Sequence, residues 1–174
     1  MGKKKAISKR KIVSSRHLAS SEGWQLSEFE YGLIVAFSGF SRWMNRCMAA
    51  AGKHDLSALE ILVLHNVNHR DKQKRLSDIA FLLNIDDTHT VNYALKKLQK
   101  ADLIAGEKQG KEIFYSTTEG GKELCNMYRV VREQCLLTGL KHMDTSDEEL
   151  SEIAAALRAL SGLYDQASRA ASSL

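Results

Sequence analysis

Proline is absent from all 174 residues of the sequence. Because proline lacks a backbone donor and clashes with the preceding helical turn, its absence favours long helices. The sequence also has no apolar run near the roughly 18 to 20 residues that a membrane span requires, and its N-terminus lacks the apolar core of a secretory signal. We therefore expect a soluble, cytoplasmic protein with no membrane attachment.

Cysteine is scarce and irregularly spaced. Cys47, Cys125 and Cys135 are the three cysteines, and they show no CxxC or other zinc-type spacing. An odd number of thiols without such spacing indicates neither a disulfide framework nor a structural zinc site. His65 and His69 lie four residues apart and could face one metal ion, but no third ligand is identifiable. We predict no metal and no cofactor.

Motifs of enzyme catalysis are missing from the sequence as well. It contains no phosphate-binding glycine loop, nucleophile elbow, zincin helix or Cys–His constellation. Glu148 and Glu149 fit the start of a helix, where acidic side chains complement the helix dipole. We predict that the protein is not an enzyme.

Positive charge is distributed unevenly along the chain. The formal net charge is +4, yet residues 1–17 carry seven Lys or Arg and no acid, and residues 70–111 carry nine basic against six acidic side chains. Two basic segments suit contact with a polyanion through part of the molecule. A solvated tail with ordinary surface lysines is the alternative.

Apolar residues recur every three or four positions along most of the chain, which is the pattern of amphipathic helices. This spacing predicts helices over about 26–52, 57–69 and 119–140, a short helix from about 77, and a final helix from 146. Serine, followed three residues later by glutamate, forms a capping box at the start of the second and the last of these. The first helix is apolar beyond a single stripe and the last has a narrow seam, so both are expected to meet a second subunit.

A tight polar turn precedes a further helix that is the most informative part of the sequence. Residues 84–87 predict this turn and the N-cap of a helix from about Thr88 to Ala101. One face of that helix is apolar and the opposite face carries polar and cationic side chains. A helix-turn-helix requires such a second helix to enter the DNA major groove.

Two segments with the composition of β-strands follow this helix. They are Leu103–Ala105 and Ile113–Thr117, and a turn that contains Gly110 can join them as a β-hairpin. Lys108 and Lys111 lie at the tip of this hairpin. Since a two-stranded hairpin is marginal alone, it is expected to pack on the helices as the wing of a winged helix.

This order of elements resembles the MarR family of bacterial transcription regulators. The motifs that carry the resemblance are Leu98-Gln99-Lys100-Ala101-Asp102-Leu103-Ile104 and the Thr-x-x-Gly turn Thr118-Glu119-Gly120-Gly121. The architecture matches over about 26–174 and the motifs between 76 and 124. The sequence departs from the family pattern in three places. Asp102 replaces a usual glycine, Asn92-Tyr93 a usual Thr-Arg pair, and Gly110-Lys111 the wing-tip Asp-x-Arg.

The resemblance implies a mainly α fold with one short β-hairpin wing. A winged helix-turn-helix domain (57–117) would lie between an N-terminal dimerisation helix (24–56) and C-terminal dimerisation helices (118–174), after a basic flexible arm (1–23). It implies a homodimeric transcription regulator, of repressor type and responsive to a small effector. This regulator would read a pseudo-palindromic site on double-stranded DNA.

Two groups of side chains are predicted to contact DNA. Those expected to neutralise phosphates are Lys96, Lys97, Lys108 and Lys111; those expected to contact base edges are His89, Asn92 and Tyr93. Asn92 is the preferred specificity residue, because asparagine can pair with adenine through two hydrogen bonds. Tyr93 is equally suited to a phosphate contact.

Aromatic and cationic side chains on or near the first helix predict a pocket for a small aromatic or anionic effector, such as regulators of this type bind. The predicted pocket residues are Trp24, Phe37, Phe40, Arg42, Trp43, Arg46 and His65. Core packing is the alternative for Phe37 and Phe40.

Cys47 could act as a thiol sensor, because Arg42 and Arg46 would stabilise its thiolate. Packing in the core is the competing interpretation, since a buried cysteine behaves as a small apolar residue. The principal rival function is an architectural nucleic-acid-binding protein without sequence specificity, in which the basic arm supplies most of the affinity.

Overall fold

The computed structural model describes residues 24–140, 142 and 145–174. The predicted basic arm, residues 1–23, lies outside the described residues. Contacts divide the chain into one unit that ends at Val131 and a second that begins at Arg132, and each is described by itself. No described helix is long and apolar enough to cross a membrane.

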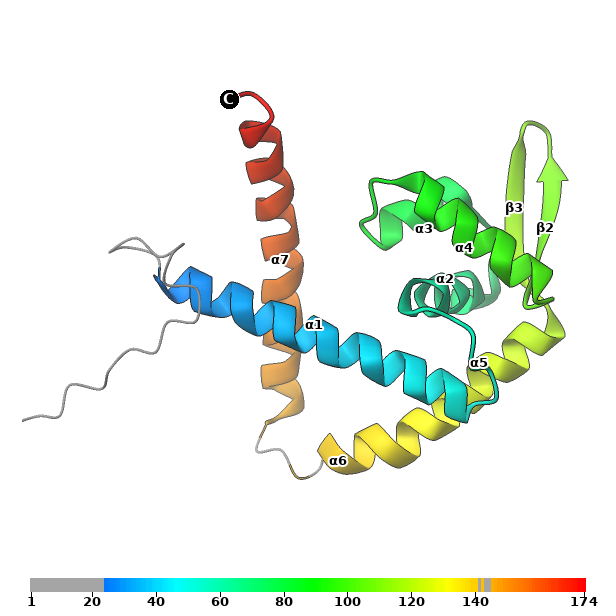
Figure 1. The fold of residues 1–174 in the computed structure, drawn as a ribbon, viewed down its shortest axis with the longest axis horizontal. Coiled ribbons are helices and arrows are strands. Elements are labelled where there is room, and N and C mark those ends of the chain that lie inside the picture. Colours follow the sequence, from blue (N-terminus) through cyan, green and yellow to red (C-terminus); the bar gives the residue numbers. More distant parts are fainter. Residues whose placement is uncertain (1–23, 141, 143–144) are drawn as a thin grey trace, which may run out of the picture. The chain divides into compact units, whose positions relative to one another are not determined.

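The first unit begins with the long helix α1, Trp24–Ala50 (Figure 1). Its C-terminal part enters the core, where Met44, Cys47 and Met48 are almost completely buried. The helix ends at Ala50 and is followed by a turn at Gly52, whose φ of +108° is a conformation that favours glycine. The first predicted helix is therefore confirmed, and its C-terminal end joins the core of this unit.

Helix α2, Ala58–Asn68, begins at the predicted capping box. The Ser57 hydroxyl accepts a hydrogen bond from the Glu60 backbone N–H at 3.3 Å, and the Glu60 carboxylate accepts one from the Ser57 N–H at 2.7 Å. Its buried residues are Ile61, Val63, Leu64 and Val67. Because they lie on several faces, α2 is the central helix of the core.

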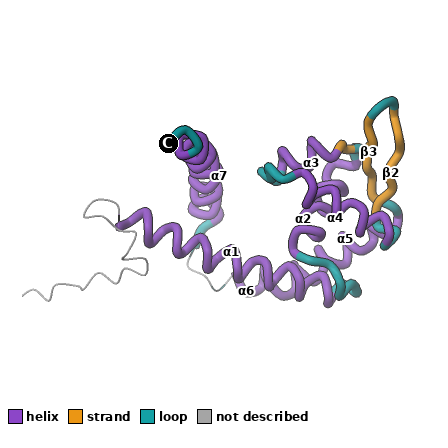
Figure 2. The backbone as a smooth tube through the Cα atoms, turned by 45° about the horizontal axis from the view of Figure 1, so that its top comes forward, coloured by secondary structure: helices purple, strands orange, loops and turns teal. Residues whose placement is uncertain are grey.

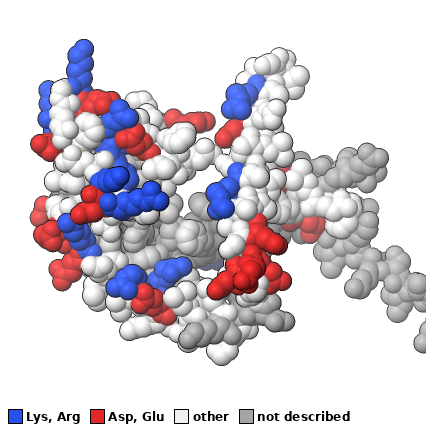
Figure 3. Space-filling view, turned by 180° about the vertical axis from the view of Figure 1, so that it is seen from behind, with Lys and Arg blue, Asp and Glu red and all other residues white. Residues whose placement is uncertain are grey.

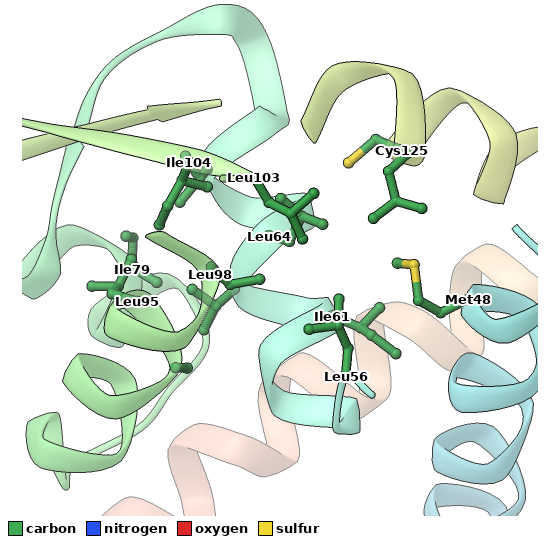
Figure 4. Packing of buried hydrophobic residues seen from close by; sticks show 14 of the residues in the cluster. Met48, Leu56, Ile61, Leu64, Ile79, Leu95, Leu98, Leu103, Ile104 and Cys125 are labelled. Atoms are coloured by element: carbon green, nitrogen blue, oxygen red, sulfur yellow. The ribbon is translucent and has the colours of Figure 1, made fainter. Parts of the chain in front are cut away.

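Helices α3 (Leu76–Leu82) and α4 (Thr88–Lys100) form the predicted helix-turn-helix pair. Asp87 caps α4 by accepting a hydrogen bond from the His89 backbone N–H at 2.9 Å. The predicted core stripe of α4 is buried: Val91, Ala94, Leu95 and Leu98. Figure 4 shows labelled side chains of α1, α2, α3, α4 and α5 within one hydrophobic cluster, in which Leu95 and Leu98 of α4 lie near Leu64 of α2 and Ile79 of α3.

The strands of the wing are longer than the sequence predicted, and a third strand pairs with one of them. Strands β2 (Ile104–Gln109) and β3 (Glu112–Thr117) pair directly on either side of a two-residue turn at Gly110. A third strand, β1 (Lys74–Arg75), pairs with β3 and gives the order β1-β3-β2 (Figure 2). The expected single hairpin is thus corrected to a three-stranded sheet.

The missed strand β1 lies within a run of charged residues, where no alternation of apolar and polar side chains reveals it. A buried lysine attaches it to the body of the unit. The Lys74 ammonium donates hydrogen bonds to the backbone oxygens of His69, at 2.7 Å, and Val67, at 3.4 Å. Burial lowers the pKa of Lys74. Both acceptors are backbone oxygens, which any residue type supplies, so the contacts leave no signal in the sequence.

The junction between α4 and the wing shows why the family pattern has a glycine where this chain has Asp102. Asp102 has a φ of +57°, a region in which a side chain is disfavoured and glycine is not. The predicted Thr-x-x-Gly turn closes on this junction. The Thr118 hydroxyl donates to the Asp102 backbone oxygen at 2.7 Å and accepts from the Gly121 N–H at 3.1 Å.

Helix α5, Glu119–Arg132, follows the wing and contributes Leu124, Cys125 and Tyr128 to the core. The predicted helix over 119–140 continues in the second unit as a π-helical segment (Glu133–Leu137) and the short α6 (Thr138–Leu140). One additional backbone residue per turn in the π segment shifts the helical faces, which a fixed 3.6-residue period does not anticipate.

The second unit contains the long helix α7, Asp147–Ala171. It begins at the predicted capping box, where the Ser146 N–H donates to Glu149 at 2.8 Å and the Ser146 hydroxyl accepts from the Glu149 N–H at 3.1 Å. The described side chains of α7 are not buried, and four large apolar ones are exposed: Leu150, Ile153, Leu157 and Leu163.

Candidate nucleic-acid interface

The outer face of α4 is polar and open to solvent. Its core stripe binds the helix to the rest of the unit, so the opposite face points away from the protein. Tyr93 is 72% exposed, and His89 and Lys96 are also exposed. The structure therefore brings these three predicted DNA-binding residues together on one accessible surface.

Asn92 lies at the edge of this face and is half-buried. It lines a hollow of about 390 Å³ between α3, α4 and the wing. The hollow is lined by Arg75, Leu76, Ser77, Asn92, Lys111, Glu112, Ile113 and Tyr115. Asn92 and Lys111 come from segments that are distant in the sequence, and the fold places both at this hollow.

Lys97 points to α2 instead of the open face of α4. Its ammonium forms an ion pair with Glu60 at 2.9 Å and donates to the Asp55 backbone oxygen at 2.5 Å. Neighbouring residues on a helix diverge by about 100°, which separates Lys97 from Lys96. Lys97 thereby joins α4 to the capping box of α2, a contact that the sequence analysis did not predict.

The wing presents Lys108 and Lys111 to solvent. Its two acidic side chains have partners on the helix-turn-helix side. Gln73 donates to Glu107 at 3.1 Å, and Arg75 donates to both carboxylate oxygens of Glu112, at 3.1 and 3.3 Å. On the face shown in Figure 3, cationic side chains extend to the end of the wing, and acidic ones are interspersed below. The hydrogen bond from Gln73 lowers the pKa of Glu107, and the one from Gln109 adds to this effect.

The predicted effector residues are spread along α1. Trp24 and Arg46 are separated by about 33 Å along a helix that rises 1.5 Å per residue, so α1 alone does not gather them. Phe37 and Phe40 are 59% and 48% exposed, whereas Trp43 packs against the core. Arg42 and Arg46 are exposed and Trp24 is half-buried.

His65 lies apart from these residues, against α5. Its ring meets that of Tyr128 edge-on at a centroid distance of 4.5 Å. Its Nε2 atom is buried and has no hydrogen-bond partner among the described residues. Burial lowers the pKa of His65 from the ordinary value of 6.5. His69, four residues on, is exposed, and the described residues contain no group of three or more potential metal ligands.

We predict that protonation of His65 destabilises the fold in mild acid. Its folded-state pKa lies below its unfolded-state pKa, so the unfolded chain binds more protons once the pH falls below about 6.5. This group then lowers the free energy of unfolding by at most about 1.4 kcal/mol per pH unit. Urea unfolding between pH 7.5 and 5 should show a shallower pH dependence in His65→Phe. The control, exposed His69→Gln, should match the wild type; equal slopes in all three proteins would contradict the prediction.

Cys47 is buried between α1 and α5. Its thiol donates a hydrogen bond to the Tyr128 backbone oxygen at 3.5 Å. Cys125 is buried in the same core, and burial raises the pKa of its thiol to about 11. The exposed thiol is that of Cys135. These positions favour packing over redox sensing for Cys47.

Sequence and structure comparisons agree with this arrangement. A family model described as a winged helix DNA-binding domain matches residues 56–121, and no curated protein sequence gives a significant match. Staphylococcus aureus MarR in complex with salicylate and kanamycin is similar at a TM-score of 0.65 and 18% identity, covering 82% of this chain and 93% of that one.

Two similar structures were solved with DNA. A mutant Escherichia coli MarR in complex with operator DNA has a TM-score of 0.65 and 14% identity, covering 81% of this chain and 99% of that one. Streptococcus pneumoniae FabT in complex with DNA has a TM-score of 0.60 and 14% identity, covering 81% and 98%. The chain thus carries a winged helix DNA-binding domain within the fold of the MarR regulators, and the resemblance predicted from its sequence is confirmed.

Proposed function

We propose that this protein is a sequence-specific, dimeric transcription regulator that acts on double-stranded DNA in the cytoplasm. The observation that carries the proposal is the open polar face of α4 beside a wing with two exposed lysines. In a winged helix-turn-helix the second helix enters the major groove and reads base edges. The wing lysines then supply charge for the phosphates.

The residues of this surface have different roles in the proposed complex. His89 and Tyr93 are exposed on the open face of α4. In the proposed complex they meet base edges, while Lys96 and the wing lysines contact phosphates. Asn92 lies nearer the wing, so it would sit at the margin of the DNA major groove. It pairs with adenine where the DNA approaches this side of α4 closely enough. We leave Lys97 out of the interface because Glu60 and Asp55 bind its ammonium.

A second copy of the chain is the proposed partner of α1 and α7. Exposed apolar surface of this extent marks an interface in a soluble protein. The large exposed apolar residues of α1 are Leu26, Phe29, Tyr31, Leu33, Ile34, Val35, Phe37 and Phe40. A homodimer that covers them would present two recognition helices to two half-sites about one duplex turn apart.

Control by a small aromatic or anionic effector is a further part of the proposal. Staphylococcus aureus MarR, which has the same fold, was solved with salicylate. Phe37, Phe40, Arg42 and Arg46 are exposed on α1 in the single chain, where a second subunit would enclose them. Aromatic and cationic side chains in such an enclosed site suit an aromatic anion.

Removal of the wing lysines tests this function. We predict that the Lys108→Gln/Lys111→Gln double variant loses on the order of tenfold or more in affinity for any duplex, because it loses two phosphate contacts. The slope of log affinity against log salt should flatten by about two units, roughly one per contact. Fluorescence anisotropy would measure both, with a fragment selected from genomic DNA and its shuffled counterpart as ligands.

The control for this experiment removes the same charge elsewhere. In the Lys53→Gln/Lys122→Gln variant, Lys53 lies in the α1–α2 loop and pairs with Asp55. Lys122 lies in α5 and pairs with Asp71 and Glu119. This double variant should keep the wild-type salt slope. Equal slopes in both double variants would remove the wing from the interface.

Deleting residues 1–17 distinguishes the architectural alternative: a specific regulator keeps its preference for the selected fragment, whereas a protein that binds through its basic arm loses nearly all affinity.

A further inference from the structure

Within the part of the chain that the structure describes, the outer part of the wing has no buried apolar side chain. Residues 105–109 of β2 and residues 112 and 113 of β3 are exposed, and Tyr115 is the buried residue of β3. Strand β1 supports β3 only at Phe114 and Tyr115. Beyond these residues the wing is a two-stranded hairpin, a structure that is marginal without further support.

Polar contacts take the place of apolar packing at this point. Arg75 is two positions from Glu112 along the sheet, since its register partner is Phe114, and its guanidinium donates to both Glu112 oxygens. A second contact runs beside it: Gln73 donates to Glu107 at 3.1 Å and accepts from the Gln109 side chain at 3.0 Å. Both contacts join the outer hairpin to residues just before α3.

Arg75 is itself held from the opposite side. Asp78, in the first turn of α3, accepts two hydrogen bonds from the guanidinium, at 2.9 and 3.1 Å, and one from the Arg75 backbone N–H at 3.0 Å. The rigid planar fork of arginine suits simultaneous contact with two carboxylates. The side chain therefore spans the distance from α3 to the outer wing in a fixed direction.

We propose that Arg75 is a positioning residue for DNA binding: through Glu112 it fixes the outer wing relative to α4, so that Lys111 and the polar face of α4 engage the same duplex. The inference rests on the proposed function, because it assigns a role to the wing within that complex. Arg75 and Lys111 line one hollow together with Asn92 of α4, so a change in the wing angle alters the separation between Lys111 and the recognition helix.

Electrostatics alone and the positioning role give opposite predictions for Glu112. Removing an acid beside a polyanion-binding surface, and freeing a cation, would raise DNA affinity if charge were the sole factor. If Glu112 holds the wing in place, the loss of its ion pair lowers affinity even though the protein becomes more positive. The Glu112→Gln variant keeps the size of the side chain and removes the charge.

The test compares Glu112→Gln with Glu107→Gln, which removes an equal charge from the same wing but leaves an amide oxygen that can still accept from Gln73. We expect Glu112→Gln to lose about threefold to tenfold in affinity for the selected fragment, the range of one charge-assisted contact. Glu107→Gln should bind as well as the wild type or better. Unchanged or higher affinity in Glu112→Gln would overturn the proposal.

Two further measurements separate the positioning of the wing from effects on the stability or the net charge of the protein. Amide nitrogen relaxation of the free protein should show lower order parameters for residues 108–112 in Glu112→Gln, with an unchanged midpoint of thermal unfolding. Arg75→Lys keeps the charge but not the fork, so it should lose affinity as Glu112→Gln does, and the double variant should lose no more than the stronger single one. Wild-type affinity in Arg75→Lys would overturn the proposal.

These readouts distinguish failure of the inference from failure of the proposed function. If the wild type shows no preference for any selected fragment, the proposed function fails, while the relaxation experiment still reports whether Arg75 orders the wing. If the wing loses order in Glu112→Gln but affinity does not change, the ion pair stiffens the wing without positioning it for DNA, and the inference is wrong.

Discussion

Gly121→Ala is expected to lower the free energy of unfolding by about 3 kcal/mol or more, the cost of forcing an atom into a packed junction. A Cβ atom at this position would lie 2.0 Å from the Leu103 backbone oxygen and 3.0 Å from its carbonyl carbon. The obstacle is backbone, so no side-chain rotation relieves it. The same Leu103 oxygen accepts a hydrogen bond from the Thr118 N–H at 3.1 Å.

Relief of this clash would require α5 to move away from the base of the wing. That movement would separate Leu124 and Cys125 from the core to which Leu103 also belongs. We therefore expect the midpoint of thermal unfolding, followed by circular dichroism, to fall by on the order of 10 °C or more.

Gly120→Ala is the matched control, because it makes the same chemical change one residue earlier. A Cβ atom there would lie 3.8 Å from the Asp102 oxygen and 3.9 Å from the Thr118 hydroxyl, which are ordinary contacts. Since alanine is favoured over glycine in helices, this variant should be as stable as the wild type or slightly more so. Equal midpoints for the two alanine variants would contradict the prediction.

The sequence predicts those parts of the fold that depend on local pattern. Capping boxes at Ser57 and Ser146 were correct because each involves residues three positions apart. The core stripe of α4 was correct because a helical period places those side chains on one face. The Thr-x-x-Gly motif was recognised, but the close approach of Gly121 to Leu103 was not, since it depends on how two elements meet.

Contacts between distant residues account for what the sequence did not reveal about the candidate site. Lys97 has the same spacing pattern as a phosphate-binding lysine, yet its partner Glu60 lies 37 residues away. Arg75 and Glu112 are also 37 residues apart, and each looks like an ordinary surface charge. Residues 70–75 are a run of mostly charged side chains, and only the pairing of β1 with β3 shows that Arg75 is the charged member that reaches the wing.

The spread of the predicted effector residues over α1 has a related cause. Periodicity groups side chains by angle around a helix, but it carries no information on their separation along the axis. Trp24 and Arg46 belong to one helix and to opposite ends of it. What can bring such residues into one site is a second chain, which links the proposed effector site to the proposed dimer.

Phe37→Glu is expected to dissociate the proposed dimer. Phe37 is 59% exposed in the single chain and lies on the same face of α1 as Leu33 and Phe40, so the substitution should leave the protomer folded. An isologous interface receives the change twice. Each copy loses about 1.5 to 3 kcal/mol of apolar burial and adds a charge that would have to be desolvated.

The dimer dissociation constant should therefore rise by at least about 100-fold, and sedimentation equilibrium should change from twice the 19.4 kDa chain mass toward a single chain. Affinity for a two-half-site fragment should fall by on the order of 100-fold, because two linked recognition helices bind with an effective concentration that separate chains lack. Asn45→Glu adds the same charge at an exposed polar position of α1 and should remain dimeric.

A wild type of single-chain mass, or a Phe37→Glu variant that stays dimeric, would show that this face of α1 does not hold a second copy. A monomeric Phe37→Glu variant with full affinity would instead show that one winged domain is sufficient for binding.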